Sequence, residues 1–186
     1  MCSPVGHSLA GYTLYLACNK NCKLIGDWGK IILYLFAANA PDLDFIPGIF
    51  MGSANRFHHG ISHTLGFSLL FALCMYMIPR FRTKKDFAIF FSLYFGHVAI
   101  DFLSADTSAP FGVMLFWPFT QKYSISSFSL FSDIHHLFLS DLFDLHNIKA
   151  MVWEAAVFFS MIVLLVLARE IRKKSFSGHR SNKQNG

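Results

Sequence analysis

Charged residues are scarce in this chain. Of its 186 residues, 15% are charged and 54% are hydrophobic, which is unlike the composition of an ordinary soluble domain. The 22 phenylalanines point the same way, because a soluble domain of this size would expose part of so much aromatic surface to water. The shortage of charge therefore argues against a soluble protein and favours a membrane protein.

Cysteine pairs and a cleavable targeting signal are also missing. The four cysteines form no C-x-x-C pair, and two of them fall inside apolar segments, so we expect no disulfide framework. They are Cys2, Cys18, Cys22 and Cys74. The N-terminus lacks the basic region followed by an apolar core that defines a secretory signal, so we expect the mature helices to direct membrane insertion.

Four common catalytic signatures are absent. The sequence contains no H-E-x-x-H, no G-x-S-x-G, no Walker glycine loop and no c-type haem motif. The sequence therefore gives no support for a zinc protease of the H-E-x-x-H type, a serine hydrolase of the α/β class or a P-loop NTPase.

Apolar segments are what the chain has instead. Residues 64–78, 87–103 and 151–168 would each span roughly 22 to 27 Å as helices, close to the hydrocarbon core of about 30 Å. Residues 8–18 and 31–40 are shorter and resemble half-spans. We therefore predict an all-α fold: a polytopic helical membrane protein with about four to five membrane-embedded helices and an interfacial outer segment.

Lysine and arginine residues set the predicted orientation. Most of them lie in two loops, at residues 20–30 and 80–85, and in the tail after residue 168, which an alternating five-helix path places on one side. Basic loops stay in the cytoplasm, so we expect a cytoplasmic C-terminus and a multi-pass protein of the bacterial inner membrane. We divide the chain into a membrane-embedded domain, residues 1–174, and a disordered cytoplasmic tail, residues 175–186. The basic clusters explain the net charge of +5 without a nucleic-acid partner.

Two motifs on the opposite, outer side contain aspartate. His97 and Asp101 are four residues apart, so they share one face of a helix and can bind one ion. Asp42 and Asp44 follow the helix-stopping Pro41, and a D-x-D turn suits a divalent cation. The alternatives are a buried His–Asp hydrogen bond for the first motif and solvated acids at a helix end for the second.

Histidines gather on the same outer side, where every histidine except His179 falls. His58, His59 and His63 lie within six positions, and neutral imidazoles are the commonest metal ligands. His7 alone would be typical of a helix start, and it gains weight only because it shares this side. Interfacial polarity without metal is the alternative for the cluster.

The remaining outer polar residues have a simpler interpretation. His135, His136 and His146 lie in the segment of residues 104–150, and we interpret them as interfacial side chains. Glu154 begins the last apolar span, where an ionisable group usually marks a functional or paired position.

Taken together, the motifs resemble a known family. They are G-H-S at residues 6–8, P-D-L-D at 41–44, H-H-G-I-S-H-T at 58–64, G-H-V-A-I-D at 96–101, F-G at 111–112 and F-W-P-F at 116–119. In this order, over about residues 3–120, they resemble the YdjM-like family of bacterial inner-membrane proteins, described as membrane-bound metal-dependent hydrolases.

The resemblance implies a set of site residues. The expected metal ligands are His7, Asp42, Asp44, His58, His63, His97 and Asp101. The expected cofactor is a divalent metal ion, with zinc preferred. The candidate catalytic residues are Asp42, Asp44 and His59, and the last of these stands where the family has arginine. A more distant similarity to zinc-dependent phospholipases C lacks their second histidine–acid pair, so we expect one or two ions.

These observations favour metal-assisted hydrolysis. A membrane-level site favours a lipid or phosphoester substrate, with membrane lipid as the partner. Two other functions remain open. One is metal transport or sensing without catalysis, since intramembrane His and Asp also line ion pathways. The other is a structural protein whose polar residues hold helices together.

Overall fold

The computed structural model covers the whole chain, and part of it is described here. The described residues are 1–19, 27–52, 57–107, 109–135 and 144–184, with side chains up to Lys173. Cys22 and His136, which the sequence analysis considered, lie outside them.

Helices make up all the regular secondary structure in the described ranges, so the predicted all-α class is confirmed. The α-helices are α1 (Pro4–Cys18), α2 (Trp28–Asn39), α3 (Phe45–Phe50), α4 (Leu65–Met77), α5 (Lys84–Phe102) and α6 (Leu145–Gln184). Short 3-10 turns form η1 (Ala40–Asp44), η3 (Ile61–His63) and η4 (Pro79–Phe81). Between α5 and α6, isolated β-bridges join Ser104 to Phe131 and Val113 to Ser124.

The helices pack as a bundle in which α1 contacts α2, α5 and α6, and α5 also contacts α2 and α4. The buried core between them includes Tyr15, Leu16, Tyr34, Ala37, Phe90 and Leu93. Gly11 allows α1 to approach α2 closely, because a Cβ there would lie 2.8 Å from Ala38 Cβ. The bundle thereby fixes the ends of α1, α2 and α5 relative to one another.

The ends of these helices lie where the sequence provides stops and caps. Proline cannot donate a backbone hydrogen bond, and α2 ends at Asn39, just before Pro41. The chain turns there into η1. Thr64 caps α4 by accepting a hydrogen bond from the Phe67 amide, and Thr83 with Asp86 forms a capping box at the start of α5. Each polar motif of the sequence therefore lies at or beside a helix end.

One helix among the described residues is long and apolar enough to cross a membrane. It is the segment Leu145–Lys173 of α6. The helices α1, α2 and α4 have 15, 12 and 13 residues, which gives lengths of roughly 18 to 23 Å. The predicted four to five spans are not confirmed. In the structure α6 continues to Gln184, so no helix end marks the predicted boundary between residues 174 and 175.

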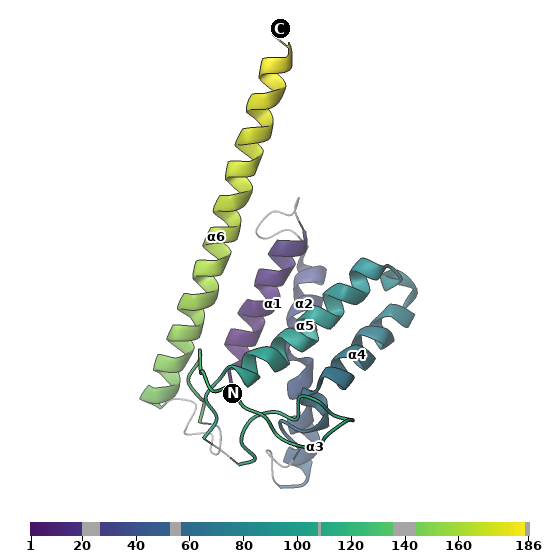
Figure 1. Ribbon diagram of the computed structural model, residues 1–186, viewed down its shortest axis with the longest axis vertical. Coiled ribbons are helices and arrows are strands. Elements are labelled where there is room, and N and C mark those ends of the chain that lie inside the picture. Colours follow the sequence, from purple (N-terminus) through teal and green to yellow (C-terminus); the bar gives the residue numbers. More distant parts are fainter. Residues whose placement is uncertain (20–26, 53–56, 108, 136–143, 185–186) are drawn as a thin grey trace.

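The N-terminus, α3, the start of α6 and the loops of residues 103–135 gather at one end of the molecule (Figure 1). The helix α6 runs from this end alongside α1 and extends beyond the bundle at the other end (Figure 1). The end that collects the loops is also the end where α2 gives way to η1 and α5 finishes. We name it the loop end, and it contains the candidate site.

A comparison of two glycines, Gly112 and Gly52, tests what stabilises the long loop between α5 and α6. Gly112 has φ +83° and a Cβ there would lie 2.3 Å from the Ser124 carbonyl oxygen, whereas a Cβ at Gly52, with φ +74°, meets no atom of the described residues within 4 Å. We expect Gly52→Ala to cost about 1 kcal/mol of stability for the left-handed backbone alone. Gly112→Ala should cost about 2 to 3 kcal/mol because it adds a clash with backbone. Thermal unfolding in detergent measures the stability of both variants. An equal loss of stability in the two would show that the Val113–Ser124 bridge does not depend on the close approach at Gly112.

Candidate metal centre

Four segments far apart in the sequence bring their histidines and aspartates together at the loop end. They are α1 with His7, η1 with Asp42, η3 with His63, and α5 with His97 and Asp101. The side chains of His7, His63, His97 and Asp101 are fully buried, and that of Asp42 is 14% exposed. Because Pro41 ends α2 and Thr64 starts α4, the turns that hold Asp42 and His63 face the C-terminal end of α5.

Four of these side chains point one atom each toward a common centre. Nε2 of His97 lies 3.2 Å from Asp42 Oδ1 and 3.1 Å from Asp101 Oδ2. Nε2 of His63 lies 3.5 Å and 3.6 Å from the same two oxygens, and 3.2 Å from the other Nε2. Ligands of a tetrahedral zinc ion, at about 2.0 to 2.1 Å from the metal, are about 3.4 Å from one another. The five distances are therefore compatible with one metal ion between the four atoms, and this group could hold one.

The other ring nitrogen of each of these histidines has a partner that orients it. His97 Nδ1 lies 2.8 Å from the carbonyl oxygen of Ala38, near the end of α2. A carbonyl oxygen accepts a hydrogen bond, so Nδ1 of His97 carries a hydrogen and Nε2 is the nitrogen that faces the centre. His63 Nδ1 lies 3.1 Å from Asp44 Oδ2 and 3.0 Å from the Ser62 hydroxyl. Metal-binding histidines usually have such a carbonyl or carboxylate partner.

His7 joins the group from the side. Its ring stacks on that of His97, with centroids 3.6 Å apart. Its Nε2 lies 3.3 Å from Asp101 Oδ1, an oxygen that also accepts a hydrogen bond from the Cys2 amide at 2.9 Å. Asp101 therefore faces His7 with one carboxylate oxygen and the centre with the other.

Several buried polar atoms of this group have no hydrogen-bond partner among the described residues. They are Nδ1 of His7 and Oδ2 of Asp42, while Oδ1 of Asp42 and Oδ2 of Asp101 have only the imidazole nitrogens of His63 and His97 near them, at 3.1 to 3.6 Å. An unsatisfied buried polar group costs roughly 1 to 3 kcal/mol, and more when it is charged. A cation at the centre would satisfy the oxygens that the protein leaves unpaired, so the residues present fit a divalent metal ion.

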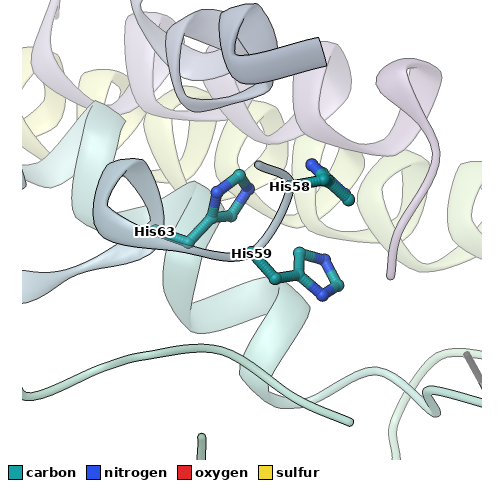
Figure 2. A group of neighbouring side chains, drawn as sticks. All are labelled: His58, His59 and His63. Carbon is teal, nitrogen blue, oxygen red and sulfur yellow. The ribbon is translucent and has the colours of Figure 1, made fainter. Parts of the chain in front are cut away.

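The histidine turn supplies a second layer of contacts. Figure 2 shows His58, His59 and His63 leaving one turn at the loop end. Nδ1 of His58 lies 3.0 Å from Asp44 Oδ1, so Asp44 holds His58 with one oxygen and His63 with the other. His59 has φ +63°, an uncommon conformation for a non-glycine residue, and its Nδ1 lies 3.4 Å from Asp106 Oδ2.

The charges in this second layer follow from burial and hydrogen bonding. Burial alone would raise the pKa of Asp44, but its hydrogen bonds with His58 and His63 hold that pKa below the ordinary value. Burial lowers the pKa of His58 to about 4, although the bond to Asp44 works in the opposite direction. At neutral pH Asp44 is therefore a carboxylate that accepts a hydrogen bond from a neutral His58 ring.

The structure thus sorts the predicted site residues into two layers. Asp42, His63, His97 and Asp101 face the centre, with His7 beside them. Asp44, His58 and His59 lie outside this group, and a carboxylate contacts each of the two histidines. The expected roles of all these residues as ligands or catalytic groups stay predictions. Sequence reasoning missed Asp106, because no motif links it to a histidine 47 positions earlier.

A smaller polar group lies elsewhere on the long loop. Nε2 of His146 is 3.1 Å from Asp133 Oδ1, Nε2 of His135 is 3.8 Å from Asp133 Oδ2, and the two imidazole rings stack. Both histidine side chains are exposed by more than two fifths. The sequence analysis interpreted these histidines as interfacial and overlooked Asp133, although the D-x-H spacing of residues 133–135 was visible.

Glu154 is a fully buried acid on α6 that joins this helix to the N-terminal segment. Its Oε1 accepts a hydrogen bond from the Ser3 amide at 2.9 Å, and its Oε2 accepts one from the Ser3 hydroxyl. Ser3 in turn caps α1 by accepting from the Gly6 amide. The acid therefore fixes the start of α1, one turn before His7, against the wall of α6.

An apolar helical bundle with one helix long and apolar enough to cross a membrane, among the described residues, and a buried His and Asp group that could hold a metal ion are the features of a helical membrane protein with a candidate metal centre. The model of the YdjM inner membrane protein family matches residues 1–173, and the chain belongs to this family. The resemblance found in the sequence is confirmed. No curated protein and no solved structure matches the chain.

Glu154 generates a prediction about stability. We expect Glu154→Ala to lower the free energy of unfolding by about 2 to 4 kcal/mol, because it leaves the amide and the hydroxyl of Ser3 without their acceptor. Glu154→Gln should cost less, since an amide oxygen still accepts. Thermal unfolding in detergent provides the measurement. Glu170→Ala is the control, because Glu170 forms an exposed pair with Lys173 and its loss should have little effect.

Proposed function

We propose that the protein is a membrane-bound metal-dependent hydrolase whose metal ion is held by Asp42, His63, His97 and Asp101. The observation that carries this proposal is the set of five distances, 3.1 to 3.6 Å, between the four converging atoms. Membership of an inner-membrane family and the unpaired carboxylate oxygens support it. Two imidazoles and two carboxylates are a ligand set for zinc or another divalent cation.

A divalent ion bound there would lower the pKa of a water molecule and polarise a phosphoryl or acyl oxygen. The protein's own residues have separate tasks. His97 and His63 are held in the ligand tautomer by the Ala38 carbonyl and the Asp44 carboxylate. Asp42 has a second carboxylate oxygen, Oδ2, without a hydrogen-bond partner, and this oxygen can orient a water molecule or accept its proton.

His59 is the candidate for contact with the substrate. Its Nδ1 faces Asp106, while its Nε2 is buried without a hydrogen-bond partner among the described residues. The strained backbone at this residue, φ +63°, is of the kind that proteins maintain at functional sites. With Nδ1 protonated toward the carboxylate of Asp106, the ring would keep Nε2 as an acceptor for a hydroxyl or a protonated phosphoryl group.

The placement of the centre favours hydrolysis over transport. An ion pathway needs ligands distributed through the membrane depth, whereas these residues belong to the start of α1, to η1 and η3 and to the last turns of α5. A scaffold is also disfavoured, because a helix contact built only for stability would not leave Oδ2 of Asp42 buried without a hydrogen-bond partner among the described residues.

Metal content is the first test. We expect the protein purified in detergent to contain near-stoichiometric zinc, manganese or iron by elemental analysis. His97→Ala and Asp42→Ala should each lose it, because each removes one of four ligands. His135→Ala is the comparison variant, because Asp133, His135 and His146 are a second group that could hold an ion, and metal lost only in this variant would place the ion there instead. A folded wild type without metal would contradict the metal centre.

Turnover is the second test. The metal-loaded protein should hydrolyse a chromogenic phosphodiester or a phospholipid, and Asp42→Ala should abolish this activity. Metal bound at full occupancy with no turnover across phosphoester and acyl-ester substrates would favour a sensing or transport role.

Asp44 generates a graded prediction. Asp44→Asn leaves the four central atoms in place but replaces the carboxylate that orients His63 and His58. We expect metal affinity to fall by about 10- to 100-fold, the usual effect of losing such a partner. His63→Ala should lose binding altogether. Competition with a chromogenic chelator measures both, and an unchanged affinity in Asp44→Asn would show that the Ser62 hydroxyl alone orients the ring.

A further inference from the structure

An apolar cavity of about 560 Å³ lies between α1, α5 and α6. Its walls include Leu14 and Ala17 from α1, Leu93 and Gly96 from α5, and Met161 and Leu165 from α6. The hydroxyl of Thr13, which also lines it, donates to the Leu9 carbonyl oxygen of its own helix at 2.7 Å. The Thr13 hydroxyl is therefore already hydrogen-bonded within its own helix, and the walls named here are apolar.

Two polar side chains of the candidate metal centre also border this cavity. They are His7 and His97, whose rings stack on each other. Nε2 of His7 faces Asp101 Oδ1 at 3.3 Å, whereas its Nδ1 is buried and lacks a hydrogen-bond partner among the described residues. The cavity thus combines apolar walls with one imidazole nitrogen that lacks a partner. It also borders the candidate metal centre, because His97 belongs to both.

The residues of α6 that line the cavity indicate which kind of ligand can reach it. The cavity-lining residues Met161 and Leu164 are 46% and 65% exposed, so the cavity opens along α6. The same part of α6 belongs to the segment that is long and apolar enough to cross a membrane. The surroundings of this opening are therefore hydrocarbon, and water would find few of the two to four polar partners that it needs.

We propose that this cavity binds one acyl chain of a membrane lipid, with the polar end of that lipid at His7 and His97. Its volume equals about 19 groups of the size of a water molecule, at about 30 Å³ each, which suits a single chain. The binding stands on the cavity itself. The further conclusion, that this lipid is the substrate whose ester is placed at the metal centre, rests on the proposed hydrolase function.

Gly96 allows the cavity to be filled without a clash. A Cβ at this residue meets no atom within 4 Å, and Gly96 lines the cavity one residue before His97. Gly96→Phe therefore introduces a large side chain at the wall of the space proposed for the chain. Gly29→Phe is the matched control, because Gly29 lies at the start of α2, where a Cβ meets only Asp27 Oδ1 at 3.6 Å.

The probe is a phosphatidylglycerol with a diazirine near the end of one acyl chain, incorporated into nanodiscs with the full-length protein. Photolysis followed by peptide mass spectrometry locates the adducts. We expect wild-type adducts to concentrate on Leu14, Leu93 and Leu165, with a several-fold loss in Gly96→Phe and no change in Gly29→Phe. Metal content and thermal unfolding of each variant are measured on the same samples.

Two results would overturn the acyl-chain site. One is labelling spread evenly over outward-facing residues such as Leu69, Leu70 and Leu73 of α4, which is the pattern of surrounding bilayer lipid. The other is unchanged cavity labelling in a folded Gly96→Phe. Cavity adducts in a protein without metal or turnover would keep the lipid site and refute the hydrolase. Metal-dependent hydrolysis of a soluble phosphodiester without cavity adducts would keep the hydrolase and refute the lipid site.

Discussion

The burial of two carboxylates against three imidazoles is the constraint around which the rest of the molecule is arranged. Asp42 and Asp101 both approach His63 and His97, and His7 covers Asp101 from the other side. Ionised groups away from water are stable only when paired or bound to metal. With Nδ1 of His97 committed to a carbonyl, positive charge at the centre must come from protonation of Nε2 or from a cation. A divalent ion neutralises both carboxylates and uses every converging lone pair.

The local structure of the bundle serves this arrangement. Pro41 ends α2 and turns Asp42 toward the centre, and the Ala38 carbonyl of the same helix end orients His97. Thr64 ends the histidine turn and starts α4. Ser3 caps α1 and is held by Glu154, so α6 contributes to the position of His7 although it carries no residue of the centre. Helix ends, not helix interiors, therefore determine most of the geometry.

Sequence reasoning predicted the helical class and grouped His7, Asp42, His63, His97 and Asp101, because the motifs name chemical types and their spacing. It could not separate the inner from the outer layer. Asp42 and Asp44 are two positions apart in one short turn, and only the three-dimensional path decides that one faces Nε2 atoms and the other Nδ1 atoms. Asp106 was missed for a related reason, because its contact with His59 comes from loop packing, whereas Asp133 could have been found from its D-x-H spacing with His135. Spans were hardest to predict, since hydropathy does not show where a helix breaks.

The neighbourhood of an apolar cavity and a charged centre has a physical consequence of its own. Hydrocarbon walls keep the effective dielectric constant low, and this strengthens the attraction between a cation and the two carboxylates. The same walls make an unpaired charge costly, so a centre that lost its cation would favour protonated histidines or rearranged side chains. The stacked rings of His7 and His97 separate these two environments. A ligand that extends from the cavity to the centre must therefore be apolar along most of its length and polar at one end.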